Sequence, residues 1–192
     1  MKKVIEKLEI VSVGTKTIPN EQNIKYLHEK SKDIKKEDIS GDYIHSIIKS
    51  MFDLMYKKGG IGIAAPMCRI PNEEKNLQLK IFVIDLEVEY HFDRKIKFIK
   101  GSNPMVFINP KIINRSDEKI FFDGGESNLC ILNRSFSVER NKDIEIEYLN
   151  QNGEEVSLKV NGSKHKILSI CIQHEQDHFD GILISDKGKE IK

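Results

Sequence analysis

The feature that most constrains this sequence is a pair of histidines, His174 and His178, which lie four positions apart in a stretch with helical apolar spacing. Residues four apart are neighbours on one face of a helix, so both imidazoles can contact a single cation. Glu175 faces the space beside such a cation, where a carboxylate can act as a general acid and base. The stretch therefore predicts a helix with a candidate metal site. The alternative is a pair of ordinary core or surface histidines.

The two histidines extend the apolar side of the predicted helix. Ser163 is the expected N-cap of this helix, and Gly181 is its expected end. The residues that recur at helical spacing are Ile167, Ile170, Cys171, His174 and His178. The candidate metal site is therefore expected on the apolar face.

Two further motifs lie earlier in the chain. Residues 60–66 read Gly-Ile-Gly-Ile-Ala-Ala-Pro, and residues 125–130 read Gly-Glu-Ser-Asn-Leu-Cys. Together with residues 174–178, they resemble the three signature motifs of the peptide deformylases, G-x-G-(L/I)-A-A-x-Q, E-G-C-L-S and H-E-x-D-H, in the same order. The resemblance implies one α+β domain over residues 1–192, with short antiparallel sheets packed around the C-terminal motif helix.

The resemblance also implies an activity, which is metal-dependent removal of the N-formyl group from formylmethionyl peptides or nascent chains. His174 and His178 would bind one divalent ion, Fe²⁺ or Zn²⁺. Glu175 would deprotonate a water molecule and later protonate the leaving amine. The backbone N–H of Leu129 would hold the oxyanion.

Five residues match the positions by which the family holds its substrate: Gly60, Ile61, Gly62, Ile170 and Cys171. The glycines would let the backbone approach an extended peptide, although they would also serve as a helix C-cap turn. Cys171 would line the pocket for the first side chain of the substrate. The alternative for Cys171 is a small buried hydrophobic residue.

Two positions depart from the motifs of the family. Asn128 stands where the family has a cysteine, its third metal ligand, and an amide oxygen suits calcium or magnesium better than iron or zinc. Metal affinity should therefore fall, whether Asn128, a water, Glu126 or Cys130 completes the shell. Met67 stands where the family has a glutamine that helps to hold the oxyanion, and a thioether cannot donate a hydrogen bond. Losing one oxyanion donor typically lowers turnover about 100- to 1000-fold.

These departures leave more than one function open. The first is a divergent deformylase with a bound metal ion and weakened activity. The alternative is a non-catalytic relative, with or without metal, that keeps the fold and the groove and binds a peptide, a ribosome or another protein. A third is a metal hydrolase that acts on a different formyl or amide compound.

Composition and charge exclude several partners. The formal net charge is +1 and no basic run is present, so nucleic acid is not an expected partner. No apolar run is long enough for a signal peptide or a membrane span, so we expect a cytoplasmic protein without a membrane partner. Cys68, Cys130 and Cys171 are odd in number and lack C-x-x-C spacing, which predicts reduced thiols.

Other elements are predicted around the motifs. Apolar periodicity predicts a helix over residues 42–57, ended by Gly59 and Gly60. Alternating apolar residues predict a β-hairpin over residues 144–160, with its turn at residues 150–153.

The polar segments are expected at the surface. Residues 71–76 and 89–103 read as surface loops, and the lysines of the second loop could border the groove and meet an acidic peptide or ribosomal surface. Residues 1–40 match the family poorly, and they are expected either to pack on the domain or to be mobile.

The remaining polar residues of the motifs have mainly structural predictions. Glu126 and Arg140 are expected to form an ion pair that fixes the Asn128 loop. Asp177 is expected either to orient a histidine or to bond backbone near the helix end. Gln173 is expected to contact a loop or lie on the helix surface.

Overall fold

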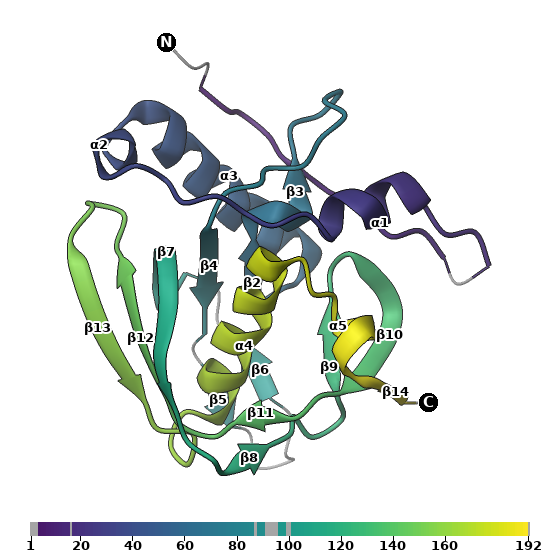
Figure 1. The fold of residues 1–192 in the computed structure, drawn as a ribbon, viewed down its shortest axis with the longest axis vertical. Helices are drawn as coiled ribbons and strands as arrows, with labels where there is room; N and C mark the ends of the chain where they lie inside the picture. The colour runs from purple at the N-terminus through teal and green to yellow at the C-terminus, as the bar shows by residue number, and fades with distance from the viewer. Residues whose placement is uncertain (1–3, 16, 87, 91–95, 99–100, 192) are drawn as a thin grey trace.

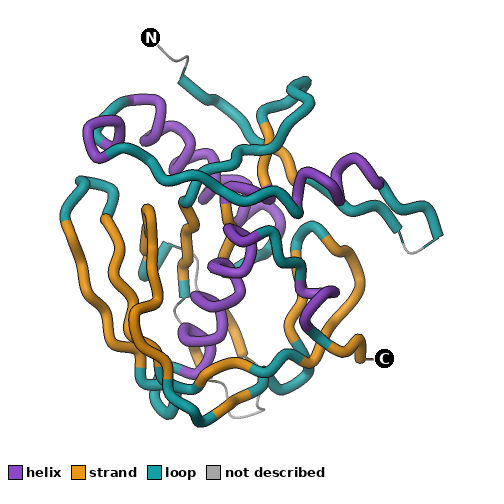
Figure 2. The backbone as a smooth tube through the Cα atoms, viewed as in Figure 1, coloured by secondary structure: helices purple, strands orange, loops and turns teal. Residues whose placement is uncertain are grey.

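Helix α4 (Lys166–Asp177) lies at the centre of the fold, with short antiparallel sheets on either side of it (Figure 1). The computed structural model describes residues 4–15, 17–86, 88–90, 96–98 and 101–191, with backbone only for 88–90 and 96–98. The tube view shows the same arrangement, with the helix enclosed by strands (Figure 2). The predicted α+β fold around a C-terminal motif helix is confirmed.

The largest sheet has five strands and covers one side of α4, and every neighbouring pair in it is antiparallel. Phe82 stacks on Phe107 within this sheet at 4.4 Å between ring centroids, and on Phe179, which follows α4, at 5.9 Å. These aromatic contacts fix the end of the motif helix against the sheet. In spatial order the strands are β13 (Glu155–Val160), β12 (Ile144–Leu149), β7 (Pro104–Arg115), β4 (Ile81–Asp85) and β2 (Gly62–Ala64).

A smaller sheet lies on the other side of α4 (Figure 1). Its strands, in spatial order, are β14 (Lys189–Ile191), β10 (Ile131–Ser137) and β9 (Glu126–Asn128). Three two-stranded pairs complete the strands: β1 (Glu9–Ile10) with β3 (Cys68–Arg69), β8 (Lys119–Ile120) with β11 (Arg140–Asn141), and β5 (Val88–Tyr90) with β6 (Ile96–Phe98). Strand β9 thus brings the second sequence motif toward α4.

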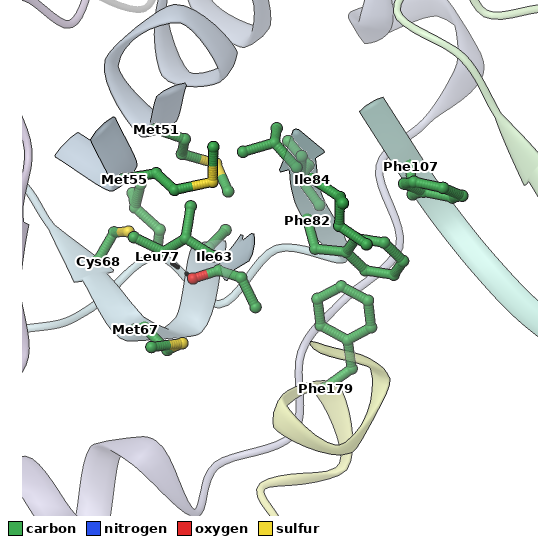
Figure 3. Close-up of a cluster of buried hydrophobic side chains, with 14 of the residues drawn as sticks. Met51, Met55, Ile63, Met67, Cys68, Leu77, Phe82, Ile84, Phe107 and Phe179 are labelled. Atoms are coloured by element: carbon green, nitrogen blue, oxygen red, sulfur yellow. Dashed lines mark hydrogen bonds between the residues drawn. The ribbon is translucent and has the colours of Figure 1, made fainter. Parts of the chain in front are cut away.

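Helix α3 (Asp42–Lys58) confirms the predicted amphipathic helix. Its C-cap, Gly59, has φ of 73°, a left-handed conformation that glycine adopts without steric strain. Figure 3 shows Met51 and Met55 pointing from α3 toward Ile63 and Leu77. The apolar side of the helix is buried and consists of Ile44, Ile47, Ile48, Met51, Leu54 and Met55. The packing of this face holds the glycine segment that follows α3 against the core.

The N-terminal region packs on the domain rather than extending from it. Leu8 and Val11 are buried, and the Val11 N–H donates to the Met67 carbonyl at 2.8 Å. The Val13 N–H donates to the Cys130 carbonyl at 3.0 Å. The region contains α1 (Glu21–Leu27) and α2 (Lys36–Ile39). The N-terminal region therefore contacts the backbone of the first and second motifs.

The predicted hairpin is confirmed, because β12 and β13 pair from Ile144–Val160 to Leu149–Glu155. The loop at residues 71–76 is largely exposed, as predicted, but Asn76 is buried. Its amide donates to the carbonyl of Pro66 at 2.5 Å and to that of Tyr26 at 3.2 Å. The segment 89–103, predicted as a surface loop, instead contains paired strand residues of β5 and β6. The side chains of its lysines predicted to border a groove, at 95, 97 and 100, lie outside the described residues.

The start of α4 differs from the prediction. Ser163 is not the N-cap, because its backbone N–H is bound by the Asn161 side chain at 3.0 Å in a turn that precedes the helix. The helix begins after His165, which makes no side-chain cap. Gly181 ends the short 3₁₀ turn η2 (His178–Asp180) in a left-handed conformation, so the predicted stop is confirmed. Within the described ranges, every helix is too short or too polar to span a bilayer.

Candidate metal and hydrolytic site

A cavity of about 500 Å³ lies between α4, the glycine segment after α3, and strands β9 and β10. Of the eleven predicted site residues, His178 does not line the cavity, but it is buried and contacts Asn128. The other ten line the cavity, and they are Gly60, Ile61, Gly62, Met67, Asn128, Leu129, Ile170, Cys171, His174 and Glu175. The structure therefore brings the three motifs to one place.

The two histidines converge on the side chain of Asn128. Their rings are 5.3 Å apart between centroids and meet edge to face. The Nδ2 atom of Asn128 lies 3.0 Å from Nε2 of His174 and 2.8 Å from Nε2 of His178. Both Nε2 atoms thus face the same point, as the predicted metal site requires.

The orientation of the Asn128 amide differs from that of a metal ligand. Its Oδ1 accepts a hydrogen bond from the backbone N–H of Cys130 at 2.8 Å. A backbone N–H can only donate, so the oxygen must face Cys130 and the NH₂ group must face the histidines. The amide oxygen that was expected to bind the metal therefore points away from the two imidazoles.

Glu126 sets the hydrogen position of His174. Its Oε2 lies 2.8 Å from Nδ1 of His174, so the Nδ1 hydrogen points at the carboxylate and the Nε2 lone pair faces the cavity. Burial raises the pKa of Glu126, but the hydrogen bonds from His174 and Arg140 outweigh burial and lower it below its usual value. The carboxylate is therefore held in its charged form.

The predicted ion pair between Glu126 and Arg140 is present and is part of a larger network. Arg140, which is only 2% exposed, donates to both carboxylate oxygens of Glu126 at 2.9 and 2.8 Å. It also donates to Asp177 at 2.5 Å. The side chain of Asp177 makes neither of its two predicted contacts, since it binds Arg140 and Lys187 instead. Gln173 was predicted to contact a loop or lie on the helix surface, but it is buried and bonds the backbone of Asn141 in strand β11.

Glu175 is buried against the glycine segment. Burial raises the pKa of its carboxyl to about 7. Its Oε2 has no hydrogen-bond partner among the described residues. A Cβ atom on Gly62 would lie 2.7 Å from Oε1 of Glu175 and 2.8 Å from Sγ of Cys171, so only glycine leaves room for both side chains. The absent Cβ thus lets the carboxyl lie directly against β2.

Among the described residues, neither predicted substitute for the missing thiolate forms a three-ligand metal site with the two histidines. Glu126 is engaged by Arg140 and His174, and burial raises the pKa of the Cys130 thiol to about 12. In the part of the chain that the structure describes, no three His, Cys, Asp or Glu side chains are arranged to hold a metal ion. All three cysteines are free thiols, as predicted. Two imidazoles fit a metal ion, whereas the third position offers a hydrogen-bond donor.

Apolar side chains that the sequence analysis did not select also line the cavity. Phe122 precedes the second motif, and Leu132 follows it on β10. Leu132 is 63% exposed, and the neighbouring Phe121 is 46% exposed. The sequence feature that could have identified these residues is their apolar character beside two consecutive glycines, at 124 and 125. They show no helical or strand periodicity, so the sequence alone did not predict that they line a cavity.

Comparisons with known proteins match the chain to one family. The family model described as Polypeptide deformylase matches residues 10–192. A peptide deformylase of Pelagibacter ubique is 32% identical over 180 residues, which cover 94% of this chain and 90% of that protein. The chloroplastic peptide deformylase 1A of Solanum lycopersicum is 34% identical over 169 residues, and the match covers 84% of this chain and 55% of that protein.

Comparison with solved structures gives the same family. A crystal structure of a peptide deformylase from Synechococcus elongatus in complex with actinonin superposes with a TM-score of 0.70 and 27% identity. The superposition covers 98% of this chain and 84% of that one. The similarity therefore extends over nearly the whole chain in both sequence and structure.

Proposed function

Because this chain belongs to the peptide deformylase family, whose members are metal-dependent hydrolases that remove formyl groups from nascent peptides, we propose that it hydrolyses the N-formyl group of formylmethionyl peptides with low turnover. The observation that carries the proposal is the buried carboxyl of Glu175, which lines the same cavity as His174. A module that only binds peptide has no chemical need for this group.

Each site residue would have a separate role in hydrolysis. Oε1 or Oε2 of Glu175 takes a proton from the attacking water and gives it to the amine nitrogen as the C–N bond breaks, leaving formate and a free amine. His174 and His178 would hold a divalent ion, which supplies an acidic water and polarises the formyl oxygen when it is bound. The Leu129 N–H would hold the oxyanion without help from Met67, which accounts for low turnover.

The walls of the cavity suit the end of an extended peptide. Gly60 and Gly62 allow the backbone to approach, and Ile170 and Cys171 present apolar surface for the first side chain. We place the reaction in the cytoplasm, where formylated nascent chains arise. A ribosomal partner stays a prediction, because the side chains of the lysines expected to contact it are not described.

A non-catalytic, peptide-binding relative is the second candidate. The observation that favours it is the Asn128 NH₂ group, which occupies the position opposite both histidines. In this function the cavity would bind the peptide end without cleaving it.

Formate release from an N-formylmethionyl tripeptide, in the presence of Fe²⁺ or Zn²⁺, separates the two functions. We expect slow release by the wild-type protein and loss of release in Glu175→Gln, which keeps the size of the side chain but cannot take a proton. Equal rates in both proteins would mean that Glu175 is not the base. Peptide binding without any formate release would establish the non-catalytic function.

A further inference from the structure

We propose that Asn128 is a hydrogen-bonded cap on His174 and His178 that takes the place of a metal ion, and that it is not a metal ligand. The inference goes beyond the proposed function, because it concerns the resting state of the site and holds whether or not the chain hydrolyses peptides. In the family a cysteine completes the metal site, whereas in this chain the NH₂ group of Asn128 faces the two histidines.

The amide and the two imidazoles match each other in number and kind. The NH₂ group of Asn128 has two hydrogens, and each of the two Nε2 atoms, at 3.0 and 2.8 Å, has one lone pair. These are the same lone pairs that a metal ion would need. One hydrogen for each imidazole therefore satisfies both Nε2 atoms without any cation.

The backbone fixes the amide in this orientation. Turning it over would place the NH₂ group against the Cys130 N–H and would place Oδ1 against two acceptor lone pairs. All three hydrogen bonds of the side chain would be lost, in a place where Asn128 is only 6% exposed. A buried polar group that loses its partner is strongly unfavourable, so the present orientation is the stable one.

A contact on the far side of its ring makes His174 an acceptor rather than a donor at Nε2. Glu126, which is held by Arg140, keeps the hydrogen of His174 on Nδ1 and leaves Nε2 free to accept. For His178, the bond from Asn128 is the only hydrogen bond that its ring makes to the described residues. A metal ion would have to displace Asn128 from both rings before it could bind them.

The zinc affinity of Asn128→Ala distinguishes a cap from a ligand. The substitution frees both Nε2 atoms, so a capping role predicts Zn²⁺ binding at least about 10-fold tighter than in the wild-type protein. A ligand role predicts weaker binding, because one coordinating oxygen is removed. The measurement is competition for Zn²⁺ with a chromophoric chelator, starting from chelator-treated protein. Equal or weaker affinity in Asn128→Ala would overturn the inference.

Two further variants calibrate this measurement. Asn128→Cys supplies a thiolate and should bind Zn²⁺ tighter than Asn128→Ala, on the order of 100-fold tighter than the wild type. Ser127→Ala changes the neighbouring exposed residue of β9 and should keep the wild-type affinity. If Ser127→Ala raised the Zn²⁺ affinity as much as Asn128→Ala, the gain would come from a change in β9 rather than from loss of the amide, and the inference would be overturned.

A second readout uses the wild-type protein and does not depend on the folding of a variant. Nitrogen NMR of the imidazoles should show hydrogen on Nδ1 and a hydrogen-bonded, unprotonated Nε2 in both rings, unchanged by equimolar Zn²⁺. Metal-shifted Nε2 signals under these conditions would contradict the cap. Formate release is measured separately, so a wild-type protein that hydrolyses peptide while it binds Zn²⁺ tightly refutes the cap and leaves the proposed function intact.

Discussion

At the scale of single residues, Gly62 determines how closely the backbone and the Glu175 carboxyl can approach. Gly62→Ala adds a Cβ atom 2.7 Å from Oε1 of Glu175, so the carboxyl must move. We expect formate release to fall at least about 10-fold, because a shift of about 1 Å in a reacting group can lower a rate by about 100-fold. The measurement is the rate with saturating peptide.

Gly41→Ala is the matched control for this substitution. Gly41 precedes α3, and its added Cβ would meet only the Asp38 carbonyl, at 3.2 Å. The rate of formate release by the Gly41→Ala protein should stay at the wild-type value. A Gly62→Ala protein with an unchanged rate would mean that Glu175 adapts without loss, against the close fit described for β2.

The histidine pair and Glu175 followed from helical spacing, because residues four apart share one face of a helix. The other site residues followed from the resemblance to the family motifs. Their roles remain predictions. The direction of the Asn128 amide could not be predicted, because it depends on the Cys130 N–H and on histidines 46 and 50 residues further along the chain. Hydrogen-bond direction is a property of the folded site rather than of the motif.

At the scale of elements, Arg140 ties β11 to β9 and to the end of α4. Replacing it by methionine leaves the carboxylates of Glu126 and Asp177 without this partner in a buried setting. Removing one member of a buried ion pair typically costs about 3–5 kcal/mol, so we expect a loss of this size in the free energy of unfolding. Urea unfolding followed by circular dichroism measures it.

Lys36→Met is the corresponding control at the surface. Lys36 pairs with Glu155, and both side chains are largely exposed, so its loss should lower stability by less than about 1 kcal/mol. Equal losses in the two variants would show that the Arg140 network contributes no more than an exposed pair.

Periodicity predicted the elements whose residues contact each other locally, such as α3 and the β12–β13 hairpin. It failed at the start of α4, where Asn161 binds the Ser163 backbone and a turn displaces the helix start. The ion pair of Glu126 and Arg140 was predicted, but its extension to Asp177 was not. That contact joins residues 37 positions apart and needs the packed positions of β11 and α4.

At the scale of the whole molecule, the N-terminal region is part of the core. Leu8 is 3% exposed, whereas the nearby Val4 is 51% exposed. Leu8→Asp places an unpaired charge in the core and should lower the free energy of unfolding by more than about 3 kcal/mol, whereas Val4→Asp should change it by less than about 0.5 kcal/mol. Thermal and urea unfolding test both. Equal effects would mean that the N-terminal strand is not packed in solution.

The fold class was predictable from the family resemblance, and the family match over residues 10–192 confirms it. The packing of the first forty residues was not, since they match the motifs poorly and carry many charged residues. Their burial depends on hydrogen bonds from Val11 and Val13 to the backbone of Met67 and Cys130, partners that only the folded chain brings near.

The central position of α4 has a consequence for the newly made chain. The helix that fills the middle of the fold spans residues 166–177, so ribosomes translate both flanking sheets, apart from β14, before it. Until Phe179 emerges just after α4, Phe82 lacks one of the aromatic rings that stack on it, and exposed apolar strands are prone to aggregate. The segment from residue 166 onward therefore sets the moment at which folding can finish, and any chaperone that assists this fold would act before that moment rather than after it.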